Sequence, residues 1–139
     1  MEAVDIARQL ETIRRDHDFG DRSAELVDEW VASALGVEAI EPILRFMESY
    51  PNLEYGTPGA LVHFVERFYG KGYEGKLVES VKRRPTLSSV WMLNRLINGT
   101  QNPEDRRLLI EILEQARLNP LADHSTLQRI DGFLERLSK

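Results

Sequence analysis

Residues 23–50, SAELVDEWVASALGVEAIEPILRFMESY, decide the fold because they contain two amphipathic helices with almost nothing between them. Apolar side chains recur every three or four residues over 23–35, which is the spacing of one helical face. Gly36 follows at once, and glycine is a typical C-terminal stop of a helix. The same spacing resumes over residues 37–50. The stretch therefore predicts two antiparallel helices, because so short a connection makes consecutive helices neighbours.

The helical pattern extends outward from this pair to both ends of the chain. Glycine, proline and asparagine divide the sequence into short segments, each with one apolar stripe. No segment alternates polar and apolar residues as a half-buried strand does. We expect eight helices over about residues 2–16, 23–35, 37–50, 57–69, 73–84, 87–98, 103–116 and 123–137. The predicted fold class is all-α, an irregular stack of antiparallel helical hairpins that forms a single domain over residues 1–139.

Polar and conformationally restricted residues mark the expected helix ends. Residues 18–21 form a turn before the second helix, and Pro42 requires the third helix to start late or to kink. Thr86 is the expected N-terminal cap of the sixth helix. The pairs expected to begin the fourth and seventh helices are Thr57 with Pro58 and Asn102 with Pro103. The last helix is expected to start near Asp123 or Ser125, and Ser125 with Gln128 is its expected capping box.

Composition favours a cytoplasmic protein. The chain has no cysteine, which excludes a disulfide framework and removes the usual ligands of structural zinc. No apolar run approaches the roughly 18 residues of a membrane span, and the N-terminal sequence lacks the basic start and apolar core of a signal peptide. We therefore expect a cytoplasmic location and no membrane partner.

Charge is unevenly distributed along the chain. The net charge of −5 disfavours nucleic acid as a partner, because such binding depends on neutralising phosphates. Residues 1–56 hold 13 acidic and 5 basic side chains, whereas residues 57–139 hold 10 and 13. An acidic face attracts a basic partner, although a merely solvated surface has the same composition.

No catalytic or metal-binding motif is present in the sequence. The histidines lack a second ligand at helical spacing. Asp16, His17 and Asp18 form one small group of possible metal ligands, but polar residues are ordinary in such a connection. His63 lies on a helix between apolar neighbours, where we expect a partly buried structural histidine. We therefore expect no enzyme activity, no catalytic residue, no metal and no cofactor.

A partner-binding edge is the functional feature that the residue pattern favours. All four tyrosines lie at expected helix ends or in connections, where a ring can face a partner while its hydroxyl stays in water. The longest connection, residues 50–56, is the expected functional loop. Simple anchoring of this loop onto the core explains the tyrosines equally well. The predicted partner-binding residues are Glu48, Tyr50, Glu54, Tyr55, Tyr73 and Glu74.

Two parts of the sequence resemble known families. Residues 30–47 are similar to the junction between two helix pairs of HEAT repeats, which implies a HEAT-like helical fold. The central part contains GTPG at 56–59, LVHFVE at 61–66, RPT at 84–86 and WMLNR at 91–95. With these motifs it resembles the small bacterial immunity proteins that accompany polymorphic toxins, including toxins of contact-dependent growth inhibition. That resemblance implies a cytoplasmic protein that binds a cognate secreted toxin domain and blocks its active site.

Taken together, we expect an immunity protein whose partner is a cognate toxin domain. Many such toxins are basic nucleases, and the acidic first part of the chain would attract one. The alternative is a HEAT-like adaptor or scaffold that binds a protein or peptide without inhibiting it. An enzyme that uses residues 16–18 with a metal would need those side chains to converge with others in a cleft. We expect a monomer or a weak dimer.

Overall fold

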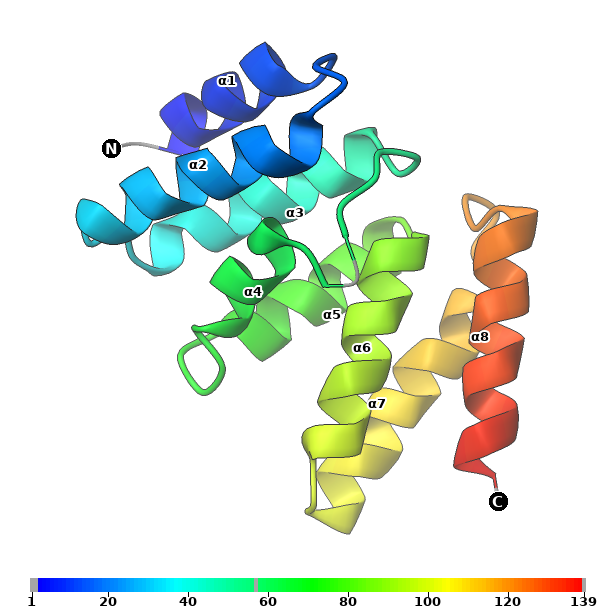
Figure 1. Ribbon diagram of the computed structural model, residues 1–139. Coiled ribbons are helices and arrows are strands. Elements are labelled where there is room, and N and C mark those ends of the chain that lie inside the picture. The colour runs from blue at the N-terminus through cyan, green and yellow to red at the C-terminus, as the bar shows by residue number, and fades with distance from the viewer. Residues whose placement is uncertain (1–2, 57, 139) are drawn as a thin grey trace. The chain divides into compact units, whose positions relative to one another are not determined.

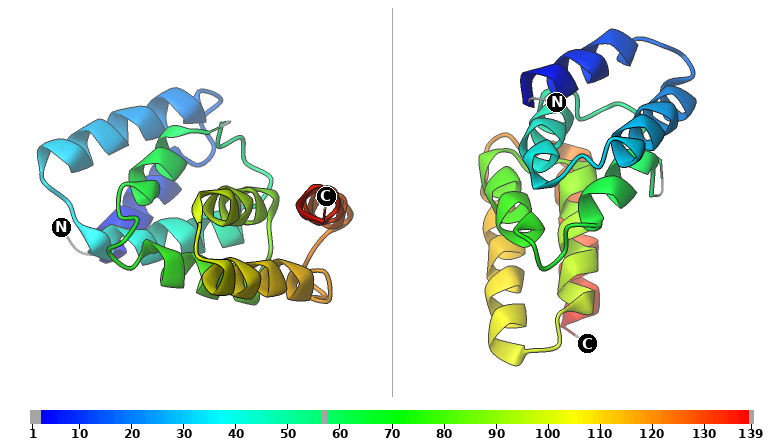
Figure 2. Two further views of the ribbon diagram at one scale, coloured as in Figure 1. Left: turned by 90° about the horizontal axis from the view of Figure 1, so that it is seen from below. Right: turned by 90° about the vertical axis from the view of Figure 1, so that its left-hand side faces the viewer.

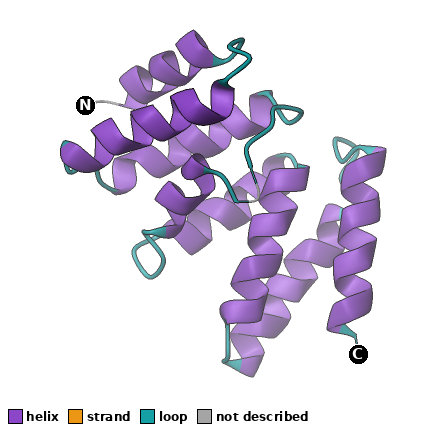
Figure 3. Ribbon diagram, in the orientation of Figure 1, coloured by secondary structure: helices purple, strands orange, loops and turns teal. Residues whose placement is uncertain are grey.

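Helices account for all the regular structure in the computed structural model, which describes residues 3–56 and 58–138 (Figure 1). Within these residues the chain forms eight α-helices, one 3-10 turn and no strand (Figure 3). The all-α prediction is therefore confirmed. The elements are α1 (Ala3–Ile13), α2 (Phe19–Ala32), η1 (Val37–Ala39), α3 (Ile40–Ser49), α4 (Ala60–Glu66), α5 (Tyr73–Arg83), α6 (Leu87–Gly99), α7 (Pro103–Ala116) and α8 (His124–Leu137).

The chain divides into two compact units, residues 1–76 and residues 77–139, and the boundary lies within α5. We call them unit 1 and unit 2 and describe each by itself. The single domain expected over residues 1–139 stays a prediction. No helix among the described residues is long and apolar enough to cross a membrane.

Unit 1 is a stack of two helical hairpins. Helix α1 packs against α2, and α3 packs against α4, while α1 also contacts α3 and α2 also contacts α4 (Figure 1, Figure 2). Contacts between helices that are two apart in the chain arise when one hairpin stacks on another. The predicted stacking of hairpins is therefore present in unit 1. The core includes the fully buried Trp30, whose ring centroid lies 5.5 Å from that of Phe64. Aliphatic side chains from α1 and α3 complete it: Ile6, Leu10, Ile40, Ile43 and Leu44.

In unit 2, α6 contacts both α7 and α8, and these two contact each other. The inner face of α6 supplies Met92, Leu93 and Ile97, each fully buried. Leu113 of α7 and Ile130 of α8 are fully buried too. A helix with apolar residues over this much of its surface is stable only when neighbours cover it on two sides, and α6 has that arrangement.

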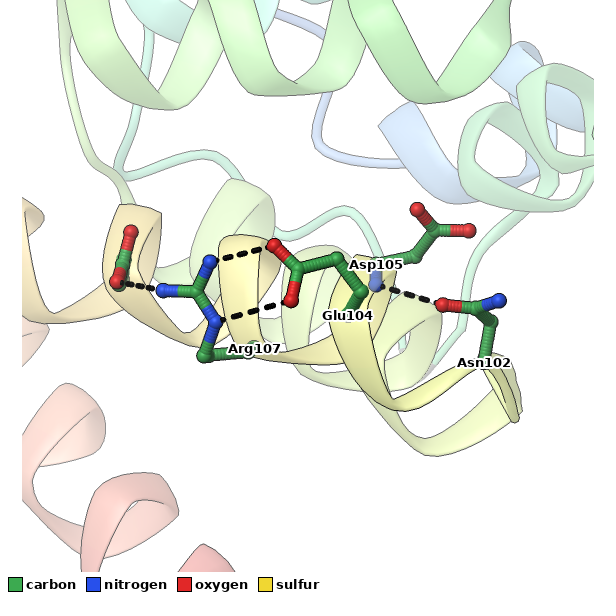
Figure 4. Close-up of polar contacts among 5 residues, drawn as sticks. Asn102, Glu104, Asp105 and Arg107 are labelled. Atoms are coloured by element: carbon green, nitrogen blue, oxygen red, sulfur yellow. Dashed lines mark hydrogen bonds and ion pairs between the residues drawn. The ribbon is translucent and has the colours of Figure 1, made fainter.

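Helix caps follow the sequence in most places. Thr86 and Ser89 form a reciprocal capping box at the start of α6, as expected of Thr86. Asn102 accepts a hydrogen bond from the backbone N–H of Asp105 at 3.0 Å, and Pro103 follows as the first residue of α7 (Figure 4). Helix α3 starts only two residues before Pro42, after η1, so the late start is confirmed.

Of the two expected starts of the last helix, Asp123 is confirmed and Ser125 is wrong. Asp123, and not Ser125, precedes α8, and its carboxylate accepts the backbone N–H of Thr126 at 2.8 Å. The expected box of Ser125 with Gln128 therefore does not form. An aspartate at this position is preferred because its charge also interacts favourably with the positive end of the helix dipole.

Helix α2 begins at Phe19 rather than at Ser23, so the turn expected at residues 18–21 is wrong from Phe19 onward. Phe19 is buried and packs against the rings of Phe46 and Tyr55. Burial of this ring fixes the start of the helix and outweighs the local preference of glycine for a turn.

Helix α4 starts at Ala60 and ends at Glu66, which makes it shorter than residues 57–69. The cap expected at Thr57 lies outside the described residues. Gly59 stands at the N-cap position, and a Cβ atom there would lie only 1.4 Å from the carbonyl oxygen of Tyr55. At the other end, the N–H groups of residues 67–69 bond three residues back, which tightens the last turn into 3-10 geometry.

Candidate binding surface

The connection after α3 is tied down by its two tyrosines. The hydroxyl of Tyr55 donates a hydrogen bond to the carbonyl oxygen of Tyr50 over 2.7 Å. The ring of Tyr55 is buried and lies edge-on to Phe19 and Phe46, with centroids 5.8 and 6.5 Å away. Burial also raises the pKa of the Tyr55 hydroxyl, because the phenolate would be desolvated. Tyr55 therefore anchors the loop on the core.

Tyr50 is half-buried and is held by contacts with two helices. Its ring packs against Phe46 of α3 at 5.0 Å, and the Arg14 guanidinium lies over the ring at 4.4 Å. A hydrogen bond with the Glu11 carboxylate raises the pKa of Tyr50 and lowers that of Glu11. Glu11 also accepts the Nε–H of Arg14 at 3.0 Å. These contacts fasten the loop to the end of α1.

The other four predicted binding residues differ in exposure. Tyr73 is 2% exposed and Glu48 is buried, whereas Glu54 is exposed. The carboxylate of Glu54 accepts the N–H of Gly56, and the half-buried Glu74 accepts the N–H of Gly70 at 2.9 Å. Both acids therefore stabilise turns.

The expected outward orientation of the rings is thus wrong for two of the tyrosines, whereas a partner-binding role of the six residues stays a prediction. Tyr55 and Tyr73 are core side chains that a partner does not reach in this conformation. Anchoring of the loop, the alternative explanation, is what the structure shows for Tyr55. Of the six predicted residues only Glu54 is fully exposed, with Tyr50 and Glu74 half-buried.

The exposed tyrosine is Tyr69, one of the four tyrosines expected at helix ends but not one of the six predicted binding residues. Tyr69 follows α4 in a tight turn and is 56% exposed. Gly70 and Gly72, both with positive φ, shape this turn. In the sequence, these two glycines are the signal for an exposed Tyr69, because glycine directly after a helix indicates a turn and turns lie at the protein surface.

The exposed large apolar side chains of unit 1 lie at or next to helix ends. Val4 is in the first turn of α1, Val31 in the last turn of α2, Val37 in η1, and Tyr69 follows α4. Because α1 and α2 run in opposite directions, the start of one and the end of the other meet at the same end (Figure 1, Figure 2). Element η1 packs directly on α1. We call these four residues the apolar end.

An acidic stripe runs along the outer face of α2. Its members, Asp21, Glu25, Asp28 and Glu29, are all exposed and recur at helical spacing. Glu25 lies 3.4 Å from the Arg22 guanidinium. Asp21, Asp28 and Glu29 form no ion pair with any described residue. The stripe therefore keeps most of its charge unneutralised.

Two of these charges stand where the helix disfavours them. Asp28 and Glu29 lie in the last turns of α2, close to the negative end of its dipole, and no basic residue occupies the last turn. Acidic side chains at a helix C-terminus destabilise the helix, by about 0.3–1 kcal/mol each when exposed. The pair is thus unfavourable for folding and lies beside the apolar end.

Residues 16–18 do not assemble a metal site. Asp16 and Asp18 both face Arg22, at 3.7 and 3.8 Å from its Nε. Among the described residues no group of three possible ligands is close enough to hold a metal ion. His63 is exposed on α4, which corrects the expected burial, because it lies opposite the stripe that faces the core.

Comparisons with protein-family models, with curated proteins and with solved structures find no match to this chain.

Proposed function

We propose that this chain is an immunity-type protein that binds and neutralises a basic toxin domain. The contact surface would be the acidic stripe of α2 together with the apolar end of unit 1. The carrying observation is the pair Asp28 and Glu29, two exposed carboxylates without a described partner at the unfavourable end of a helix. A binding role accounts for charges that do not serve the fold.

The charge of unit 1 supports a basic partner. Residues 1–76 carry 15 acidic and 8 basic side chains, a net charge of −7, whereas residues 77–139 carry 8 and 10. Opposite charge accelerates the encounter of two proteins, and salt slows it. Association with the toxin should therefore weaken as the ionic strength rises.

The apolar end gives the interface a centre. Val4, Val31, Val37 and Tyr69 are 44–60% exposed. Protein interfaces have an apolar or aromatic centre and a polar rim, and tyrosine is enriched among the residues that dominate the binding energy. With the acidic stripe as its rim, this surface suits a partner with apolar side chains surrounded by lysine or arginine.

Co-expression with the protein encoded by the neighbouring gene tests the proposal. We expect the two proteins to co-purify and this chain to abolish the toxicity of its neighbour. The variant with Asp28→Lys and Glu29→Lys should lose both properties. The matched control has Asp105→Lys and Glu114→Lys, which changes the net charge equally on exposed positions of α7 and should keep both.

Three results would contradict the proposal. Absence of any complex would exclude the neighbouring protein as the partner. Equal loss of co-purification and rescue in the control variant would exclude α2 as the contact surface. A complex without rescue from toxicity would exclude neutralisation and would favour the adaptor role. Circular dichroism of both variants establishes that the helices remain folded.

A further inference from the structure

A shallow groove in unit 2 lies between α8 and the start of α6. Its volume is about 410 Å³. All but one of its residues come from a single face of α8, at spacings of three or four residues, so the groove follows that helix. It is lined by Leu87, Ser125, Gln128, Arg129, Gly132 and Arg136.

Two arginines of the groove are free of acidic partners. Within the described residues neither Arg129 nor Arg136 forms an ion pair, whereas Arg107 pairs with two glutamates (Figure 4). Arg117 pairs with Asp131. Both guanidiniums instead lie near the ring of the buried Phe133, at 6.0 and 5.2 Å from its centroid. The Nε–H of Arg136 also donates to the carbonyl oxygen of Gly132 at 3.3 Å. Contact with the ring restrains each guanidinium and leaves the two terminal Nη groups of its fork available.

The floor of the groove contains a glycine that packing does not require. Gly132 lies in the middle of α8, where glycine destabilises a helix relative to alanine. A Cβ atom at this position would meet only Nη2 of Arg136, at an ordinary contact distance of 3.9 Å. Alanine would therefore fit the fold better, and its methyl group would fill part of the groove.

From these three features we propose that the groove binds an extended acidic segment of a partner protein. Arg129 and Arg136 are seven residues apart, which corresponds to about 10.5 Å along a helix. Carboxylates three residues apart on an extended chain of polyproline II conformation lie on the same side of it, about 9 Å apart. Each guanidinium can then receive one carboxylate in a two-bond fork. The backbone between them lies over Gly132, and Leu87 contacts an apolar side chain.

A carboxylate ligand fits the chain better than nucleic acid does. Binding to nucleic acid draws its affinity from many phosphate contacts, and the groove offers two guanidiniums in a chain of net charge −5. The acidic segment also differs from the basic partner proposed for α2. The two proposals therefore use different residues and fail independently.

A synthetic peptide provides the probe. Acetyl-Gly-Glu-Ser-Leu-Glu-Gly-amide carries two glutamates three residues apart, and the same peptide with glutamines is the control. Isothermal titration calorimetry of the full chain at low salt should detect binding of the glutamate peptide alone. Arg129→Gln and Arg136→Gln should each weaken binding by about tenfold, the loss expected for one charged hydrogen-bonded contact. Arg95→Gln removes an arginine that lies over Trp91 outside the groove and should leave binding unchanged.

Gly132→Ala separates binding from folding. We expect this variant to raise Tm by about 3 °C, as a glycine-to-alanine change in a helix does, and yet to weaken peptide binding. Unchanged affinity in both arginine variants would overturn the proposal. Displacement of the peptide by inorganic phosphate or single-stranded DNA at equal concentration would also overturn it. Self-association of the chain that Arg129→Gln abolishes would overturn it as well.

Discussion

The hydroxyl of Tyr55 and the carbonyl oxygen of Tyr50, 2.7 Å apart, close the connection that follows α3. The hydrogen bond joins a core side chain to the backbone of a half-buried residue that Arg14 and Glu11 also hold. A segment that the sequence marks as a functional loop is thus fixed at both ends. Its tyrosines therefore contribute to the stability of the loop.

Removal of the Tyr55 hydroxyl should therefore destabilise the protein. Tyr55→Phe keeps the buried ring but leaves the Tyr50 carbonyl without this partner, which should lower the free energy of unfolding by about 1 kcal/mol. Urea denaturation measures the change. Tyr69→Phe removes a hydroxyl from an exposed ring and should change the free energy by less than about 0.5 kcal/mol. Equal effects in the two variants would contradict the role of the hydrogen bond.

The raised pKa of Tyr55 makes the same contact sensitive to alkali. A tyrosine in the unfolded chain has a pKa of about 10. Since the folded value is higher, the contribution of Tyr55 is complete below about pH 10 and is lost as the pH rises toward the folded pKa. Unfolding measured between pH 8 and pH 11 should show a steeper loss of stability in the wild type than in Tyr55→Phe. Parallel curves would refute this.

Gly59 should tolerate no side chain. Gly59→Ala would place a Cβ atom 1.4 Å from the Tyr55 carbonyl oxygen, and backbone atoms cannot yield as a flexible side chain does. We expect a loss of stability above about 3 kcal/mol, the range of severe steric changes. Gly20→Ala is the control, because no atom lies within 4 Å of the added Cβ in helix α2. This control should be neutral or stabilising, and a harmless Gly59→Ala would show that the connection can be rearranged.

Helical periodicity and cap chemistry are local properties, and the sequence predicts them well. The apolar stripe of α6 and the cap residues Thr86 and Asn102 lie where expected, because each depends on residues within one or two turns. The stacked hairpins follow for the same reason. Short connections leave consecutive helices no arrangement except antiparallel contact.

The candidate site was harder to predict because exposure depends on distant parts of the chain. Tyr55 and Tyr69 both follow helices, yet one is buried and the other exposed. Burial of Tyr55 depends on the ring of Phe19, which is 36 residues earlier and starts a helix where glycine indicated a turn. The composition also shows that the first part of the chain is acidic. It does not show which carboxylates in that part lack ion-pair partners.

A second long-range contact joins α1 to α2. The indole N–H of the fully buried Trp30 donates to the side-chain oxygen of Gln9 over 2.8 Å. Gln9→Leu would leave this donor unpaired in the core, so the free energy of unfolding should fall by about 1–3 kcal/mol. Chemical denaturation measures the loss. Gln115→Leu, at an exposed position of α7, should change stability little.

A double-mutant cycle identifies the source of that loss. Trp30→Phe removes the indole N–H as well as part of the ring, so Gln9→Leu should cost far less in that background. Additive effects of the two changes would mean that Gln9 acts through packing alone and that the hydrogen bond contributes nothing measurable.

The cap of α8 should make unit 2 sensitive to acid. Hydrogen bonds from Thr126 lower the pKa of Asp123, so its contribution is present above the unfolded pKa near 3.8 and is lost as the pH falls through the folded value. Asp123→Ala should cost about 1 kcal/mol at pH 7, as loss of an N-cap does, and less at pH 2. Asp123→Asn keeps an acceptor oxygen but does not titrate. As the pH falls from 5 to 2, the wild type should therefore lose more stability than Asp123→Asn does. A constant difference in stability between the two proteins would show that the carboxylate charge plays no part in the cap.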